Sequence, residues 1–199
     1  MKRIIFACLL LAGLAISNGA SAQQNMTTLS YSMGLGVSNT GDFISKYSWR
    51  GFGFEYRHLS TPNVGYGVNF GWNTFYQEMP LGTYEYETIS MTGYQWRYFN
   101  SFPMMAVVDY FAQPDNKHMN PYFGLGAGVQ YNLADADFGV YRFERDAWPF
   151  SLAPEVGVLI HTPNGPSFNV GIKYMYGFKT KELPSDSHLL FNVGFTFSE

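Results

Sequence analysis

Cysteine and charge are scarce in this chain. One cysteine, Cys8, occurs among 199 residues, so no intrachain disulfide can form and disulfide-stabilised folds are excluded. Charged residues make up 14% of the chain, against roughly 25% in an ordinary soluble protein. The formal net charge of −3 gives no indication of nucleic-acid binding. The chain has too little charge to cover the surface of a typical soluble protein.

Long apolar runs are also missing beyond residue 22, where no segment approaches the roughly 18 apolar residues of a membrane helix. The chain begins with Lys2 and Arg3, then an apolar run over 4–16, then Ala20-Ser21-Ala22. This order is typical of a cleaved secretory signal. We therefore expect a signal peptide at 1–22 and one domain at 23–199. An exported membrane protein without a spanning helix has one remaining solution, a closed β-barrel.

Aromatic residues are abundant, at 19%, and they follow a period of two. The last segment shows the pattern, with large apolar residues at 189, 191, 193, 195 and 197 and mainly small or polar residues between them. In 121–133 the second face carries Gly124, Gly126 and Gly128. This pattern is typical of a transmembrane β-barrel strand, with apolar residues toward lipid and small or polar residues inside. A soluble lipocalin-like barrel would reverse the faces and leave a surface of Gly, Asn and Ser.

Eight segments carry the alternation: 29–37, 51–57, 64–73, 84–111, 121–133, 150–160, 168–178 and 189–197. Segment 84–111 could be two strands. A series of alternating large apolar residues, however, stays at even-numbered positions on both sides of Asn100–Pro103, so we interpret the segment as one strand. Short turns are expected at 61–63, 113–120 and 162–166, and longer outer loops at 39–46, 78–83, 134–148 and 180–187. The prediction is an eight-stranded antiparallel up-and-down transmembrane β-barrel with both termini in the periplasm.

Three runs carry a family resemblance: 51–57 (GFGFEYR), 68–75 (VNFGWNTF) and 121–129 (PYFGLGAGV). They resemble the small outer-membrane β-barrel proteins of Bacteroidetes and the broader OmpA-like and OmpW-like superfamily. The resemblance implies an outer-membrane location, with outer-membrane lipid and lipopolysaccharide as partners. It also implies that the barrel assembly machinery recognises an aromatic residue in the last strand. Here Phe197 is followed by Ser198 and Glu199, a small departure from the family pattern.

Six charged residues fall on the inward parity: Glu55, Arg57, Arg97, Asp109, Glu155 and Lys173. An eight-stranded barrel is just wide enough inside for side chains. Three acids and three bases would then pair as a salt-bridged network that fills the lumen, because an unpaired buried charge is costly. The alternative is a gated ion or proton path through the same network.

Aromatic residues on the outward parity predict interfacial belts, since Tyr and Trp have an apolar ring and a polar end. The belt residues toward the outer strand ends are Trp96, Tyr131, Tyr174 and Tyr176, and those toward the inner ends are Tyr56, Tyr66, Tyr110 and Phe197. The expected outer loop 134–148 holds the candidate recognition residues, which are Tyr141, Arg142, Glu144, Arg145 and Asp146.

The favoured function is a structural or surface-interaction role in the outer membrane. A ligand-binding or adhesion module acting through the outer loops, with an unknown extracellular ligand, is the first alternative. A lipid A deacylase is the second, because His58-Leu59-Ser60 is similar to the His-x-Ser pair of such enzymes. Neither a cofactor nor a metal is expected, since the four histidines show no ligand spacing. An open porin would need roughly 16 strands.

Overall fold

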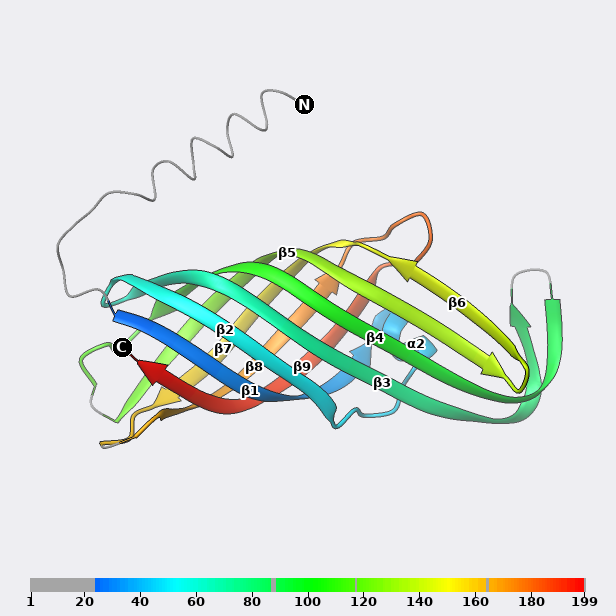
Figure 1. The fold of residues 1–199 in the computed structure, drawn as a ribbon, viewed down its shortest axis with the longest axis horizontal. Helices are drawn as coiled ribbons and strands as arrows, with labels where there is room; N and C mark the ends of the chain where they lie inside the picture. The colour runs from blue at the N-terminus through cyan, green and yellow to red at the C-terminus, as the bar shows by residue number, and fades with distance from the viewer. Residues whose placement is uncertain (1–23, 87–88, 117, 164, 199) are drawn as a thin grey trace, which may run out of the picture.

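A computed structural model describes residues 24–86, 89–116, 118–163 and 165–198. Within these residues, nine β-strands form one antiparallel sheet that closes on itself, with one short helix at an end of it (Figure 1). No helix in the described part of the chain is long and apolar enough to span a bilayer. The elements are β1 (Gln24–Val37), α2 (Ser38–Phe43), β2 (Arg50–Thr61), β3 (Val64–Tyr86), β4 (Ile89–Phe111), β5 (Met119–Phe138), β6 (Tyr141–Ala147), β7 (Phe150–Ile160), β8 (Ser167–Gly177) and β9 (Asp186–Ser198).

The ring closes because β1 pairs with β2 on one side and with β9 on the other. β6 pairs with 132–138 of β5 and β7 pairs with 119–129 of β5, so these two strands share one position in the ring. The ring therefore has eight positions, and the predicted eight-stranded barrel is confirmed. Met26 pairs with Ser198, which places the beginning of β1 and the end of β9 at the same end of the barrel.

The predicted alternation is present in the burial of successive side chains. Along 101–110 of β4, every odd-numbered residue is buried and every even-numbered residue is exposed. Large apolar side chains cover the outside, as with Phe123 at 63% exposure and Ile172 at 44%. The lipocalin-like alternative is therefore wrong for this chain. A continuous apolar exterior of this kind suits lipid rather than water.

The lumen is narrow enough that large side chains lie against glycine. The ring of Tyr122 on β5 faces Gly157 on β7, where an added Cβ would come within 2.6 Å of Tyr122. Toward the end that carries α2, the lumen is filled by an apolar cluster that includes Ile44, Phe75, Phe99, Met175 and Leu190. Small residues in the inward positions thus make room for a few large ones.

The hairpin formed by β3 and β4 differs from the prediction. The segment 84–111 is one strand only from Ile89 onward, because Tyr84 and Glu85 belong to the end of β3. The predicted loop at 78–83 is part of β3, and a register shift between Met79 and Gly82 accommodates Pro80 within the strand. Pro and Gly in this run resemble a turn in the sequence, but a bulge absorbs them without ending the pairing.

The predicted outer loop at 134–148 is also wrong, because most of it is paired strand. β5 continues to Phe138, the chain turns at Gly139–Val140, and β6 returns alongside β5. Gly139 has a φ of 63°, which is the left-handed conformation that glycine adopts readily. The mixed charges that suggested a solvated loop are instead distributed over the two faces of a hairpin.

The outer parts of four strands form a sheet that extends beyond the ring (Figure 1). We call this the protruding sheet, and it consists of 75–86 of β3, 89–99 of β4, 132–138 of β5 and all of β6. The end of the barrel that carries it is called the outer mouth. The opposite end holds the short β2–β3, β4–β5 and β7–β8 connections, close to the predicted turns.

Candidate functional site

Five of the six predicted lumen charges meet in one buried network. Arg57 on β2 contacts Glu55 and lies 2.5 Å from Asp109 on β4. Lys173 on β8 lies 2.5 Å from Glu55 and 3.0 Å from Glu155 on β7. All five are at most 6% exposed. Four strands are therefore linked across the lumen by charge-assisted hydrogen bonds, which are stronger than neutral ones.

Uncharged side chains complete this network, and the sequence analysis missed them. The hydroxyl of Tyr122 donates to Glu155 at 2.8 Å, and the amide of Asn69 donates to Glu55 at 2.8 Å. The Arg57 guanidinium lies 5.4 Å from the centroid of the Tyr122 ring. Tyr122 and Asn69 both stand at inward positions of the alternation, but an uncharged side chain there does not by itself indicate a salt-bridged network.

Arg97 does not join the network. Its Nε donates to Gln95 at 2.8 Å and its Nη1 donates to the carbonyl of Phe43 at 2.9 Å. The guanidinium also lies 5.1 Å from the ring centroid of Phe43. The network consequently contains three carboxylates and two cations, rather than the three pairs expected. Arg97 is placed at the outer mouth because β4 continues well beyond the ring.

The outer mouth is occupied by α2 and the residue after it. Ile44 is fully buried beneath the helix. The amide of Asn39 donates to the Ser185 carbonyl at 2.9 Å, and the Ser187 N–H donates to the Thr40 hydroxyl at 2.9 Å. These bonds join α2, in the connection between β1 and β2, to the β8–β9 connection and to the start of β9.

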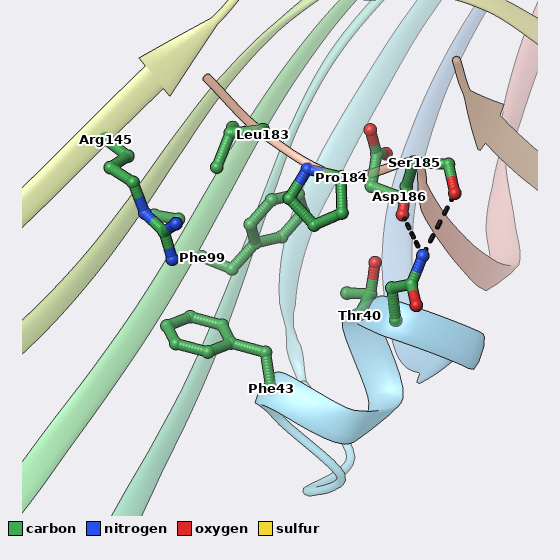
Figure 2. Close-up of a pocket in the computed structure, with 10 residues that line it drawn as sticks. Thr40, Phe43, Phe99, Arg145, Leu183, Pro184, Ser185 and Asp186 are labelled. Carbon is green, nitrogen blue, oxygen red and sulfur yellow. Dashed lines mark hydrogen bonds between the residues drawn. The ribbon is translucent and has the colours of Figure 1, made fainter. Parts of the chain in front are cut away.

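A pocket of about 90 Å³ lies between α2, β4, β5, β6 and the β8–β9 connection (Figure 2). Its apolar lining comes from Phe43, Phe99, Ala134, Leu183 and Pro184. Its polar lining comes from Asn39, Thr40, Arg145, Ser185 and Asp186. The pocket brings together residues that are distant in sequence, and only Arg145 among them was a predicted site residue.

The predicted recognition residues lie on β6 rather than on a loop. Arg142 lies 2.6 Å from Asp135 and 3.6 Å from Asp137, both on β5. The hydrogen bond and charge of Asp135 raise the pKa of Arg142. Arg145 points to the opposite face and lines the pocket. The other three predicted residues, all on β6, are Tyr141, Glu144 and Asp146.

The predicted belt residues lie on the exterior. Near the outer mouth, the rings of Tyr131 and Trp148 are 4.9 Å apart, and those of Tyr176 and Phe178 are 5.0 Å apart. Trp96 and Tyr174 are partly exposed. At the other end, the exposed outward residues are Tyr56, Tyr66, Tyr110 and Phe197.

The residues of the His-x-Ser run have separate partners. His58 Nδ1 lies 2.8 Å from the Asn25 side-chain oxygen, and the Ser60 hydroxyl donates to the Val64 carbonyl at 3.2 Å. A nucleophilic Ser would instead be hydrogen-bonded to its His base. In the described part of the chain, no three His, Cys, Asp or Glu side chains are grouped to hold a metal ion.

Comparison with protein-family models and with curated protein sequences finds no match. Solved structures do match. Neisserial surface protein A is 15% identical, with a TM-score of 0.52 over 90% of this chain and 98% of that one. OprG of Pseudomonas aeruginosa is 11% identical, with a TM-score of 0.53 over 88% and 95%. Ail of Yersinia pestis is 16% identical, with a TM-score of 0.50 over 89% and 100%.

These similarities concern the fold. The closed ring, the apolar exterior and the charged lumen agree with it. The chain therefore has the fold of the small eight-stranded outer-membrane β-barrels.

Proposed function

We propose that the protein resides in the outer membrane and displays the protruding sheet outside the cell as an interaction surface. The free edge of β6 carries this proposal. In the described part of the chain, β6 pairs with β5 on one side and with no strand on the other. The backbone groups of such an edge can pair with an extended segment of a partner. Export by the expected signal peptide at 1–22, which lies outside the described residues, is part of the same proposal.

The second free edge of the protruding sheet is less suited to pairing. Among the described residues, 75–86 of β3 pairs with no strand on its β2 side, because the β2–β3 pairing ends at Thr74. This edge contains Pro80, which has no N–H group, and the register shift between Met79 and Gly82. Both features are known protections against edge pairing. The edge of β6 is therefore the one that we assign to partner binding.

Charge indicates the partner. Asp135, Asp137 and Glu144 lie near Arg142 on one face of the hairpin, so carboxylates outnumber cations there. A basic extended segment would complement this face electrostatically. We propose an extended basic peptide segment of another protein as the binding partner, in a role that needs no catalysis.

A binding experiment on cells that express the protein tests this assignment. The probe is an alternating Lys-Val peptide, and the control is the same peptide N-methylated at alternate residues. We expect N-methylation to weaken binding by about ten-fold, because it removes backbone hydrogen bonds. Deletion of 135–146 should abolish binding while heat-modifiable migration on a detergent gel is kept. Equal binding of both peptides, or no binding, would overturn the proposal.

We infer further that the lumen is closed to solutes. Support comes from the network around Arg57 and Lys173 and from the apolar cluster above it, which includes the buried Ile44. Purified protein in planar bilayers should show no steady conductance. A steady open pore would contradict closure without affecting the binding proposal.

A further inference from the structure

The pocket at the outer mouth lies beside β6, the strand with the free edge. Figure 2 shows Phe43, Phe99 and Leu183 around the space, with Arg145 of β6 at one side. In the described part of the chain, β6 is the last strand of the sheet and pairs only with β5. The pocket and the edge to which we assign partner binding are therefore neighbours, and Arg145 belongs to both.

The alternation along β6 determines which residue of an added strand would meet the pocket. Arg145 pairs with Ala134 of β5, and both line the pocket, so this face of the hairpin is the pocket side. Phe143 lies on the same face, where its ring is 6.0 Å from that of Phe138. Paired residues of neighbouring strands project from the same face, with Cβ atoms about 4.5–5.5 Å apart. The residue of an added strand that pairs with Arg145 would therefore point toward the pocket.

Apolar side chains form one contiguous part of the pocket lining. Phe99 and Ala134 are 5% and 7% exposed, and both belong to the apolar cluster that fills the lumen near α2. Leu183 belongs to the same cluster, and Phe43 packs against it. A side chain that entered the pocket would thus extend an existing apolar core, and burial of its apolar surface would stabilise the complex.

The two charged side chains of the lining have opposite signs. Arg145 is positive and Asp186 is negative, and the carboxylate of Asp186 accepts hydrogen bonds from Gln130 at 2.5 Å and from Asn132 at 2.8 Å. Together these two charges give the lining no net preference for an anion or a cation. A neutral apolar group is therefore the occupant that the lining favours.

The pocket wall formed by the β8–β9 connection is held by its own hydrogen bonds. The Thr180 N–H donates to the Leu183 carbonyl at 3.0 Å, and the Leu183 N–H donates to the Thr180 hydroxyl at 2.9 Å. The Asn39 amide of α2 holds Ser185 two residues further on, at 2.9 Å. A wall that is already in place lowers the cost of ordering side chains and loops on binding.

We propose that the partner segment at the β6 edge carries one branched apolar residue, such as Leu or Ile, which pairs with Arg145 and inserts its side chain into this pocket. This inference rests on the proposed function, because the β6 edge supplies the backbone pairing. In strand addition, the backbone gives affinity and pockets for alternate side chains give specificity. The basic residues of the segment then face Asp135, Asp137 and Glu144 on the opposite face.

The size of the pocket limits the anchor residue. The pocket has about 90 Å³ and is partly open, whereas a closed cavity of roughly 150 Å³ holds benzene. A four-carbon side chain therefore fits better than a large ring. The partner segment is thus defined as one that alternates basic residues with small ones and has a single branched apolar residue among the small ones.

Binding of labelled peptides to the full protein in phosphatidylcholine nanodiscs tests the proposal, with empty nanodiscs as background. The probe is Lys-Ala-Lys-X-Lys-Ala-Lys, in which X is Leu, Ala or Asn. Leu and Asn have similar shapes, but only Leu is apolar. We expect the Leu peptide to bind about ten-fold more tightly than either of the others, because only its side chain gains from burial in an apolar pocket.

Three variants locate the anchor. Ala134→Leu fills the pocket and Leu183→Ala removes part of its wall, and each should lower the preference for Leu to about two-fold or less. Glu182→Gln changes an exposed neighbour of Leu183 and is the control, which should keep the full preference. Heat-modifiable migration shows which variants form the barrel, and Leu183→Ala decides the question if Ala134→Leu does not fold. An unchanged preference in the folded pocket variants would overturn the site.

Failure of the anchor and failure of edge pairing give different results. Equal binding of the Leu, Ala and Asn peptides would overturn the anchor and leave the β6 edge as proposed. No binding of any peptide would overturn both. A preference for Leu that survives N-methylation of alternate residues would overturn the anchor, because the side chain would then enter the pocket without strand pairing.

Discussion

Single side chains in this barrel are held by partners far away in the chain. Lys173 on β8 contacts Glu55 on β2, and Arg57 contacts Asp109 on β4. These positions are shielded from water, because each residue is at most 6% exposed, so a charge that loses its partner is left both desolvated and unpaired. Each residue of the network therefore depends on the others for its stability.

Arg57→Met should lower the free energy of unfolding by about 3–5 kcal/mol, because it leaves Glu55 and Asp109 buried with too little positive charge. Denaturant unfolding in lipid vesicles measures the change. Lys46→Gln changes an exposed side chain and is the control, which should have little effect. Similar effects of the two substitutions would contradict the network's role.

Tyr122→Phe tests the uncharged part of the network. It removes the hydroxyl that bonds Glu155 at 2.8 Å and keeps the ring that packs beside Gly157. A buried acceptor that loses its donor costs about 1–3 kcal/mol, and the same vesicle assay detects a loss of that size. Tyr174→Phe on the exterior is the control and should be close to neutral. A neutral result for Tyr122→Phe would show that Glu155 does not need the hydroxyl.

At the scale of elements, the main feature of this barrel is its long hairpins. β3 and β4 each have 23 residues, more than the 9–11 that a tilted strand needs to cross a bilayer. Their excess forms the protruding sheet. The same holds for β5, whose outer part pairs with β6 rather than β7. The candidate sites of the outer mouth exist because these strands continue beyond the ring.

Gly139→Ala tests the turn of the β5–β6 hairpin. The φ of Gly139 is 63°, a conformation that costs a residue with a Cβ roughly 1–2 kcal/mol. We expect faster hydrogen exchange in 132–147 with the rest of the barrel unchanged. Gly93→Ala is the control, because an added Cβ there meets nothing within 4 Å and Gly93 has no positive φ. Equal exchange in the two variants would contradict the strained turn.

At the scale of the whole molecule, the distribution of polar and apolar side chains indicates whether the exterior faces lipid or water. The exterior is apolar between the two aromatic ends, and charged groups are concentrated in the lumen and the outer mouth. This is the reverse of a soluble protein. An apolar exterior of this extent suits lipid rather than water.

Ile172→Arg places a charge at the middle of β8 on the lipid-facing side, where Ile172 is 44% exposed. In a bilayer this substitution should cost about 2–4 kcal/mol, falling to about 0–1 kcal/mol near the interface. Phe178→Arg, which replaces one member of the Tyr176–Phe178 pair near the outer mouth, is the interfacial control. Folding into lipid vesicles measures both. Equal costs at the two depths would contradict a membrane-spanning barrel.

The sequence by itself determined the closed barrel, the face that each residue occupies and the number of ring positions. These follow from a period of two, which is a local property of the backbone, so Phe102 and Ser101 could be assigned to opposite faces without a structure. Parity likewise placed Glu55, Arg57, Asp109, Glu155 and Lys173 inside. The ends of the strands were harder to predict from the sequence. Pro80 and Gly82, for example, resemble a turn, and only the pairing of β3 with β4 shows that they form a bulge.

Only the tertiary structure decided which residues meet. The alternation along a strand shows which face a residue occupies but not its position along the barrel axis. It therefore could not show that Arg97 lies apart from Arg57 and Lys173. It also could not show that 134–148 is a hairpin, because pairing between β5 and β6 depends on register. The pocket depends on contacts between α2 and Ser185, about 146 residues apart along the chain. Such contacts are set by ring closure, which brings the first and last strands together and which no local pattern in the sequence records.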